Sequence, residues 1–412
     1  MPNVTRRNHF VPQWYQRRFL PAGVTHFFYL DLKPDTVVSP GGKKYQRRAL
    51  LRRGPPRCFC VDDLYSIKLG SWSTDAIERQ FFGPIDARGE KAVGFFLNYG
   101  MRNGAHEALK SMMPYMSAQR FRTRRGLDYL RHVTNVRNPN VVLAFMQRVF
   151  QANGTMWTEG VWEIVRARQS STKFIVTDEP VTFYNARVFP LSPSIPYPLD
   201  ADLSELGTRT IFPLSLDACL IITHLQFVRD PWRNPRQSRT NARSFATAMF
   251  DLRDIQTDRE LEEDEVLRIN FILKKRATRY VAAAEEQWLY PEKFVSVTHW
   301  SKLEEDWFLL PNLYKVDFLG GVIVRYKDGS SWAVDEYGRS PRHPDYQDKS
   351  QQDREWAAAQ KAKLAWAVKR EGRSLARSHG DFNDVEDKIM REELAEYHAD
   401  RDRKKSRRAF GG

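Results

Sequence analysis

The segment from Asn8 to Phe19, close to the start of the chain, constrains the fold more than any other stretch. It reads NHFVPQWYQRRF, so it holds four aromatic side chains, and arginine pairs stand at positions 6–7 and 17–18. The start of a chain is commonly frayed and polar, whereas aromatic rings in this number bury a large apolar area. We therefore predict that the segment packs against the body of the fold and carries His9 and Gln13 into the interior or into a cleft.

Length and charge bound what the chain can do. At 412 residues it is long for one core and short for three, which predicts two domains. Its formal net charge is +14, and a positive field attracts phosphates, so nucleic acid is the first candidate partner. The alternative is a basic enzyme with no polyanion partner.

The cysteines and the apolar runs indicate the compartment. Cys58, Cys60 and Cys219 lack the spacing of a zinc site, and so few cysteines fit a reducing compartment. No apolar stretch at the N-terminus has the length of a signal peptide, and no run approaches the roughly 18 residues that span a bilayer. We expect a cytoplasmic protein without a membrane partner.

Several catalytic motifs are absent from the sequence. It contains no Gly-x-Gly-x-x-Gly after a strand, no P-loop, no His-Glu-x-x-His and no Gly-x-Ser-x-Gly. Their absence argues against nucleotide hydrolases of the P-loop type, zincins, α/β-hydrolases and dinucleotide-dependent oxidoreductases. We expect no dinucleotide cofactor.

Hydrophobic periodicity predicts an α+β fold, in which a helical bundle packs on a small, mainly antiparallel sheet. A helix is expected to begin at Asp75 and to be broken at Gly83-Pro84. A second helical region is expected over 107–132, where Pro114 kinks or splits the helix. Further helices are expected over 140–151, 157–168, 241–250 and 261–284. Strands are expected over 25–32, 58–69, 173–177, 208–212 and 218–225, the last three forming one sheet. A C-terminal β-hairpin around Asp328-Gly329 and a helix over 351–370 form an appendage. The predicted domains are 1–290, a hairpin module at 291–345, and a charged helical extension with a basic tail at 346–412.

Six basic side chains gather before Gly54-Pro55-Pro56. They are Lys43, Lys44, Arg47, Arg48, Arg52 and Arg53. Such a cluster is either a loop that contacts nucleic-acid phosphates or a solvated surface segment.

A second group of residues has the chemistry of a reactive site. His9 with the carboxylates of Glu78 and Asp178 could hold a divalent metal, or act as acid and base while an arginine holds a phosphate. No diagnostic spacing links them, and the identity of any metal is unknown. Each also has a structural explanation: His9 can donate to a buried carbonyl, Asp178 can bond its own turn, and Glu78 can cap a helix.

The order of several motifs along the chain is that of a known family. His9-Phe-Val-Pro-Gln13 is followed by Ile77-Glu78, by Gln119 and Arg122, by Thr177-Asp178-Glu179-Pro180-Val181, by Pro213-Leu214-Ser215 and by Asn241. In this order the chain resembles the mostly bacterial domain-of-unknown-function family 4238 over roughly residues 5–290. It departs from the family pattern at Gln16, in place of a leucine, and at Thr177 and Glu179. The resemblance implies an organisation but no activity, and it marks His9, Gln13, Glu78, Gln119, Arg122 and Asp178 as the candidate catalytic residues.

The leading hypothesis is a protein that acts on nucleic acid, with phosphodiesterase chemistry as one form of it. The competing hypothesis is a non-catalytic protein that binds nucleic acid or another protein. A third is an enzyme on a small anionic substrate, for which a deep, closed, arginine-lined pocket is expected. The oligomeric state is left open.

Overall fold

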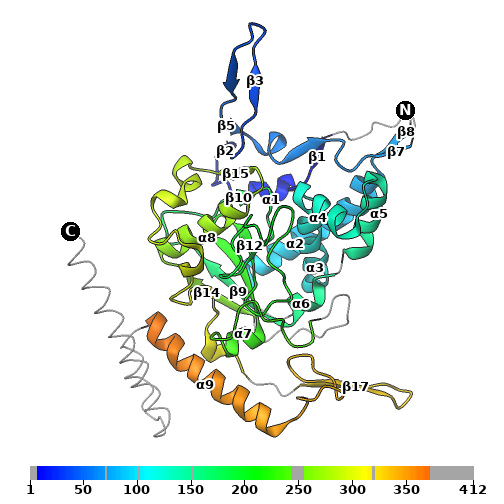
Figure 1. Cartoon of the computed structure of the whole chain (residues 1–412), viewed down its shortest axis with the longest axis vertical. Coiled ribbons are helices and arrows are strands. Elements are labelled where there is room, and N and C mark those ends of the chain that lie inside the picture. The colour runs from blue at the N-terminus through cyan, green and yellow to red at the C-terminus, as the bar shows by residue number, and fades with distance from the viewer. Residues whose placement is uncertain are drawn as a thin grey trace, which may run out of the picture.

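The computed structural model of the chain describes residues 7–69, 72–100, 103–150, 152–242, 255–317 and 321–371. It confirms the α+β class, with helices beside several mainly antiparallel sheets (Figure 1). Within these ranges no helix combines the length and the apolar character needed to cross a bilayer. The cytoplasmic location stays a prediction.

The larger sheet has five strands in the order β11-β12-β13-β9-β14, and only the β14–β9 pair is parallel. The strands are β9 (Gly160–Arg166), β11 (Thr182–Tyr184), β12 (Arg209–Ser215), β13 (Ala218–His224) and β14 (Gln256–Glu260). The predicted helix over 157–168 is therefore wrong: α6 (Gly154–Thr158) is short, and β9 follows it. Because β9 is covered on both faces, its residues from Val161 to Arg166 are all buried and show no alternation that would mark a strand.

The smaller sheet has four antiparallel strands in the order β10-β15-β2-β5. They are β2 (Phe27–Asp31), β5 (Leu50–Arg53), β10 (Val176–Thr177) and β15 (Tyr280–Ala283). The run at 173–177 was expected beside the strands at 208–212 and 218–225, but β10 belongs to this other sheet. The turn at 178–181 thus leads from one sheet to the other.

The N-terminal segment packs on the body of the fold, as predicted. β1 (Arg7–His9) pairs with β6 (Cys60–Asp62), and α1 (Gln13–Arg17) follows. The Tyr15 hydroxyl donates to the Pro213 carbonyl at 2.5 Å, and its ring stacks on Phe212. Gln13 is only partly buried and accepts from Arg17 at 3.2 Å, whereas Gln16 is fully buried.

A helical layer lies beside the sheets (Figure 1). It consists of the π-helix η2 (Ile77–Phe82), α2 (Gly83–Leu97), α3 (Ala105–Phe121), α4 (Arg124–Thr134) and α5 (Pro139–Val149). Gly83-Pro84 does not break the first helix, because a proline in the first turn of α2 costs no hydrogen bond. Pro114 lies inside α3, and the break falls at Thr123, whose hydroxyl caps α4 by accepting from the Gly126 amide at 3.0 Å.

Shorter elements connect these layers. β3 (Thr36–Val38) and β4 (Lys44–Gln46) form a hairpin that projects from the body (Figure 1). The expected strand over 58–69 is two strands, β6 and β7 (Ile67–Leu69), and β7 pairs with β8 (Trp72–Thr74). The expected helix over 261–284 is α8 (Glu263–Arg276) followed by β15. The other short helical elements are α7 (Leu225–Arg229), η1 (Pro55–Arg57), η4 (Glu286–Leu289), η5 (Pro291–Lys293), η6 (Trp300–Lys302) and η7 (Leu313–Lys315).

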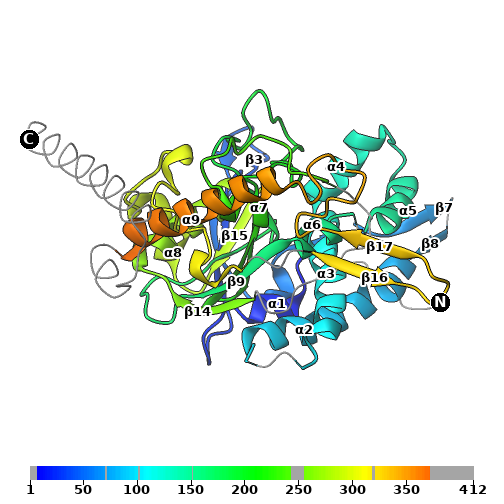
Figure 2. The same cartoon turned by 90° about the horizontal axis from the view of Figure 1, so that it is seen from below.

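The C-terminal part contains the predicted hairpin and helix. β16 (Val322–Arg325) pairs with β17 (Ser331–Val334), and α9 (Lys349–Glu371) runs along one side of the molecule (Figure 2). Trp300, Phe308 and Leu309 belong to the large core, and Trp366 of α9 belongs to a second, smaller core. Packing therefore continues past residue 290, and the three-part domain division stays a prediction. The expected helix over 241–250 lies mostly outside the described residues, and the basic tail at 401–408 lies wholly outside them.

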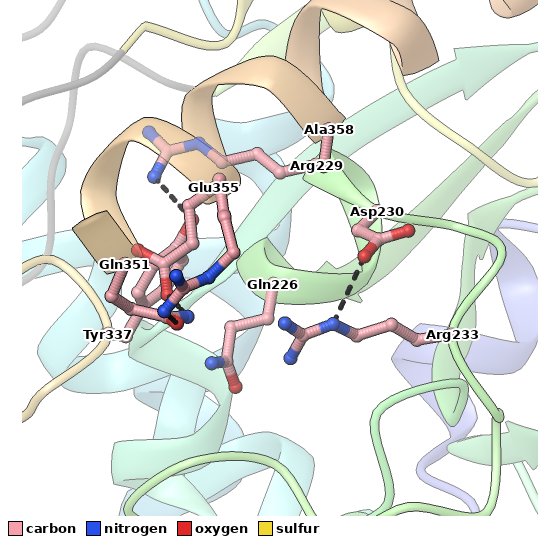
Figure 3. Close-up of a pocket in the computed structure, with 9 residues that line it drawn as sticks. Gln226, Arg229, Asp230, Arg233, Tyr337, Gln351, Glu355 and Ala358 are labelled. Atoms are coloured by element: carbon pink, nitrogen blue, oxygen red, sulfur yellow. Dashed lines mark hydrogen bonds and ion pairs between the residues drawn. The ribbon is translucent and has the colours of Figure 1, made fainter. Parts of the chain in front are cut away.

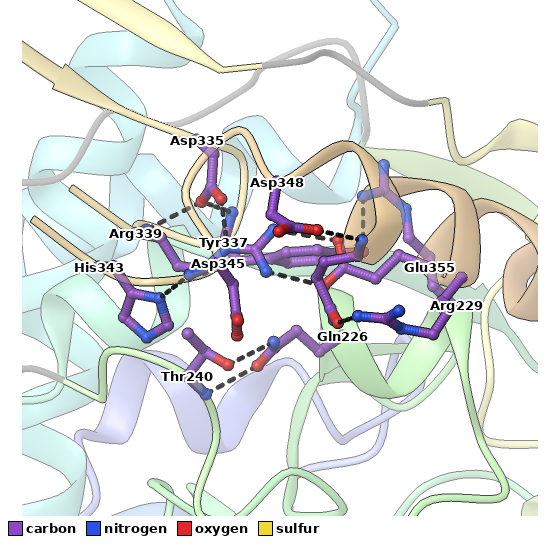
Figure 4. A network of polar contacts seen from close by, with 12 residues as sticks. Gln226, Arg229, Thr240, Asp335, Tyr337, Arg339, His343, Asp345, Asp348 and Glu355 are labelled. Atoms are coloured by element: carbon purple, nitrogen blue, oxygen red, sulfur yellow. Dashed lines mark hydrogen bonds and ion pairs between the residues drawn. The ribbon is translucent and has the colours of Figure 1, made fainter. Parts of the chain in front are cut away.

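A polar seam joins α9 to α7. A cavity of 230 Å³ opens there, lined by Arg233, Tyr337 and Glu355 among others (Figure 3). Arg229 donates to Glu336 at 2.8 Å and to the Tyr337 hydroxyl at 3.0 Å, while Arg339 donates to both oxygens of Glu355 (Figure 4). Since Arg233 also pairs with Asp230 at 3.1 Å, these arginines have partners within the protein.

Candidate functional site

The buried arginine at the end of α3 gathers three of the predicted residues. Arg122 is 1% exposed and donates to both oxygens of Asp86, on α2, at 2.9 and 3.0 Å. Gln119, with its amide oxygen turned toward the guanidinium, accepts from Arg122 Nε at 3.0 Å. A fully buried cation is stable only with such partners, so Asp86 and Gln119 fix its position.

Glu78 lies in the electrostatic field of the same arginine. Burial raises the pKa of Glu78 to about 7; Arg122 opposes this rise, and Asp86 and Asp75 add to it. Its Oε2 atom is buried and has no hydrogen-bond partner among the residues that the structure describes. A carboxyl group with this pKa exchanges protons near neutral pH, which is what acid–base chemistry requires.

Two tyrosines complete this group, which we call the Arg122 cluster (Tyr65, Glu78, Asp86, Tyr115, Gln119 and Arg122). The Tyr65 hydroxyl donates to the Arg122 carbonyl at 2.5 Å. The Tyr115 hydroxyl is fully buried and unpartnered within the described ranges. Glu78 belongs to the π-helix η2. Turns of this kind are rare in proteins, and those that occur are often found at functional sites.

His9 lies at the edge of this cluster. Its Nε2 atom is 3.3 Å from the Pro56 carbonyl, which is the structural role considered above. Burial lowers the pKa of His9, the hydrogen bond to Pro56 opposes this, and the charges of Arg7 and Arg122 lower it further. His9 is therefore harder to protonate than a solvent-exposed histidine.

Asp178 is held by a different part of the chain. Its carboxylate accepts from the backbone amides of Thr278, Arg279 and Tyr280 at 2.9, 2.7 and 2.9 Å. Between residues that are described, no three His, Cys, Asp or Glu side chains are close enough to hold a metal. His9, Glu78 and Asp178 are thus not a set of metal ligands.

Glu179, the neighbour of Asp178, is also buried but has other partners. Its two oxygens accept from the hydroxyls of Thr123 at 3.0 Å and Thr278 at 3.2 Å. Burial raises the pKa of Glu179 to about 8, and the adjacent Asp178 adds to the rise. Sequence reasoning treated Glu179 only as a departure from the family motif.

Two cavities meet at the ring of Tyr280. The first, which we call the inner cavity, has 380 Å³ and is lined by Phe10, Arg124, Asp178, Glu179 and Tyr197 among others. The second, the arginine depression, has 470 Å³, and its lining includes Arg7, Arg53, Arg57 and Tyr29. Tyr280 lines both and stacks on Tyr29 with ring centroids 5.0 Å apart.

The predicted basic cluster divides between two elements. Lys43, Lys44, Arg47 and Arg48 are exposed on and beside the projecting hairpin, together with Tyr45, which is 52% exposed. Arg52 and Arg53 lie on β5, where their guanidinium groups cover the rings of Phe28 and Tyr29. Only Arg53 of the six lines a cavity described above.

Several residues of these sites were not predicted. Asp86 carries no motif and reaches Arg122 only because α2 packs on α3. Arg7 and Arg57 come from segments about 50 residues apart that meet through the β1–β6 pairing. In the sequence, only the arginine pair at 6–7 and the Pro-Pro-Arg57 turn could have pointed to these two arginines.

The architecture and motif positions define an α+β protein whose N-terminal segment, helical layer and sheets form one unit. The chain matches the family described as protein of unknown function (DUF4238) over residues 7–287, and it belongs to that family. The resemblance drawn from the motifs is thereby confirmed. Neither curated proteins nor solved structures give a match.

Proposed function

We propose that this protein binds nucleic acid across the arginine depression and the projecting hairpin. The observation that carries the proposal is the convergence of Arg7, on β1, with Arg53 and Arg57, on the adjoining elements β5 and η1, at one depression. Its lining also includes Tyr29 and Tyr280. Guanidinium groups bind phosphate oxygens in a planar, bidentate manner. Asp62, the one carboxylate in this lining, is mostly exposed and 3.7 Å from Arg7.

The neighbouring hairpin favours a polymer over a small anion. It extends the basic surface with Lys43, Lys44, Arg47 and Arg48, and no ion pair between described residues uses these four side chains. Tyr45 stands exposed among them. Proteins that bind single strands combine such a positive surface with aromatic rings on which bases stack.

Binding accounts for this geometry better than hydrolysis does. Of the six predicted catalytic residues, only Asp178 lines either of the two cavities that meet at Tyr280. Its carboxylate already accepts three backbone hydrogen bonds. A catalytic group must contact its substrate, so the phosphodiesterase form of the hypothesis has no support from these contacts.

The test is the binding of a fluorescent single strand by the full chain over a range of salt concentrations. We expect affinity to fall steeply with salt, because each neutralised phosphate releases counterions. Arg53→Gln/Arg57→Gln is expected to weaken binding and to reduce the log–log salt slope by roughly one to one and a half. Lys43→Gln/Lys44→Gln tests the hairpin separately, at side chains that make no core contact.

The matched control is Lys327→Gln/Arg342→Gln. This pair removes the same charge from exposed positions in the C-terminal part, which lies away from the hairpin. We expect it to bind like the unchanged protein. Equal losses in all three double variants would mean that net charge alone drives binding, and salt-independent binding or none would overturn the proposal.

A further inference from the structure

The β3–β4 hairpin forms a narrow ribbon that projects away from the body of the protein (Figure 1). At its base the Arg47 amide donates to the Asp35 carbonyl at 2.9 Å. Beside the turn the Ser39 amide donates to the Lys43 carbonyl at 2.9 Å. From Asp35 to the turn at 40–42 the ribbon is roughly 20 Å long, at about 3.3 Å per residue. A side chain added at either turn glycine would meet no atom of the described residues within 4 Å, its chain neighbours aside.

Both faces of this ribbon are open to solvent. All three residues of β4 are exposed, and on β3 only Val37 is partly covered. Val38 and Tyr45 are 56% and 52% exposed. Because Val38 pairs with Lys44, the residue before Tyr45, these two apolar side chains point to opposite faces. A two-stranded ribbon with no covering layer is only marginally stable in water, which indicates that a binding partner supplies the cover.

The charge of the ribbon selects an anionic partner. From Thr36 to Val61 the chain holds no Asp or Glu and seven Lys or Arg. At the base, Asp31 and Asp35 both pair with Arg279, and Lys33 between them is exposed. The positive charge of the ribbon is therefore not compensated by carboxylates of its own segment.

The shape of the ribbon selects among nucleic acids, which contacts to phosphates alone do not do. The two strands of a ribbon lie about 4.8 Å apart, and such a ribbon fits the major groove of B-DNA, which is about 12 Å wide and about 8.5 Å deep. A projection of roughly 20 Å reaches the floor of this groove while the body of the protein stays outside it. The major groove of an A-form RNA duplex is deep and narrow and does not admit side chains.

We propose that the β3–β4 ribbon enters the major groove of duplex DNA. Lys43 and Lys44 contact the phosphates that border the groove, and Val38 and Tyr45 contact the apolar edges of bases, such as the thymine methyl group. The inference rests on the proposed function, because it names the form of nucleic acid that the same surface prefers. Single strands still bind through their phosphates, but more weakly.

The test compares the affinities of the full chain for duplex DNA, for duplex RNA of the same sequence and for single-stranded DNA of the same length. We expect duplex DNA to bind about tenfold more tightly than duplex RNA, since only the DNA groove admits the ribbon. Duplex DNA that binds no more tightly than duplex RNA overturns the groove inference, even when single strands bind in a salt-dependent manner. No binding of any of the three nucleic acids overturns the proposed function as well.

Val37→Pro breaks the ribbon without changing its charge. The hydrogen bonds near its two ends lie two residues to either side, so Val37 and Tyr45 are a hydrogen-bonded pair, from which proline removes a donor. We expect this variant to bind duplex DNA about tenfold more weakly. Its affinity for single strands should stay within about twofold, because every basic side chain is kept.

The matched control is Val324→Pro, which breaks the C-terminal hairpin β16–β17 opposite Trp332. It should bind duplex DNA like the unchanged protein. Neither ribbon belongs to the two hydrophobic cores, so both variants should keep the thermal unfolding midpoint of the unchanged protein. Equal losses of duplex affinity in the two variants, or no loss in Val37→Pro, overturn the groove inference.

Discussion

Glu78 is the residue whose protonation depends most directly on the surrounding fold. It is a half-buried carboxyl beside a buried cation, and its pKa of about 7 stands well above the ordinary value of 4.5. Two hydrogen bonds to Asp86 hold the guanidinium group of Arg122 in place. The cluster therefore fixes a charge next to a group that exchanges a proton near neutral pH.

This arrangement predicts how stability depends on pH. A carboxyl group with a raised pKa in the folded state favours folding while it is protonated, so its contribution is complete below about pH 4.5 and is lost as the pH rises through 7. Between pH 4.5 and pH 8, we expect the free energy of unfolding to fall by about 1–3 kcal/mol less in Glu78→Gln than in the unchanged protein. Denaturant unfolding of both proteins at these two pH values measures this difference.

Glu90→Gln, at an exposed position of α2, is the control and should keep the pH dependence of the unchanged protein. An unfolding free energy of Glu78→Gln that falls with pH as steeply as that of the unchanged protein would show that Glu78 is ionised throughout this range.

At the scale of elements, the turn between β10 and β11 is the joint between the two sheets. Asp178 begins this turn, and its carboxylate binds three successive amides at the start of β15. The same carboxylate thus fixes both the exit from β10 and the entry into β15. Asp178 therefore has a structural role at this joint.

Asp178→Asn should therefore destabilise the protein strongly. The amide keeps one acceptor oxygen and places an amino group against backbone N–H donors, so we expect a loss of about 2–5 kcal/mol in the free energy of unfolding. Asp35→Asn changes an exposed carboxylate near the same strand and should have a much smaller effect. Equal losses in the two variants would mean that the hydrogen bonds of Asp178 do not hold the turn after β10 to the start of β15.

At the scale of the whole molecule, the C-terminal helix is attached to the family domain by a small core of its own. Trp366 is 3% exposed there and packs with Phe227 and Leu310. On the same helix, Trp356 is 52% exposed. One helix thus carries one covered and one exposed tryptophan.

This pair gives a matched test of the attachment. Trp366→Ala removes about 3–5 kcal/mol of packing, so we expect faster amide hydrogen exchange over residues 349–371. Trp356→Ala should leave exchange there unchanged. Equal exchange in the two variants would mean that the seam around Arg229 and Arg339, and not the tryptophan, holds α9 in place.

Local pattern was sufficient for part of this structure. Turn residues predicted the hairpin at Asp328-Gly329, and helical periodicity predicted the helix that the structure places over 349–371. Aromatic content predicted the packing of the N-terminal segment. Each of these properties is visible within one short stretch of sequence. Motif order was sufficient for the family. It marked six candidate residues, and three of these, Glu78, Gln119 and Arg122, lie together in the structure.

Only the tertiary structure decided the rest. β9 was expected to be helical because both of its faces are buried, which removes the period of two, and nothing local states that a second layer covers it. Contacts between distant segments decide the pairing of Arg122 with Asp86, the hydrogen bonds of Asp178 to the amides at 278–280, and the meeting of Arg7 with Arg57. The sequence alone therefore determined the family and the local elements, whereas long-range packing decided which charges are buried together and which surround a cavity.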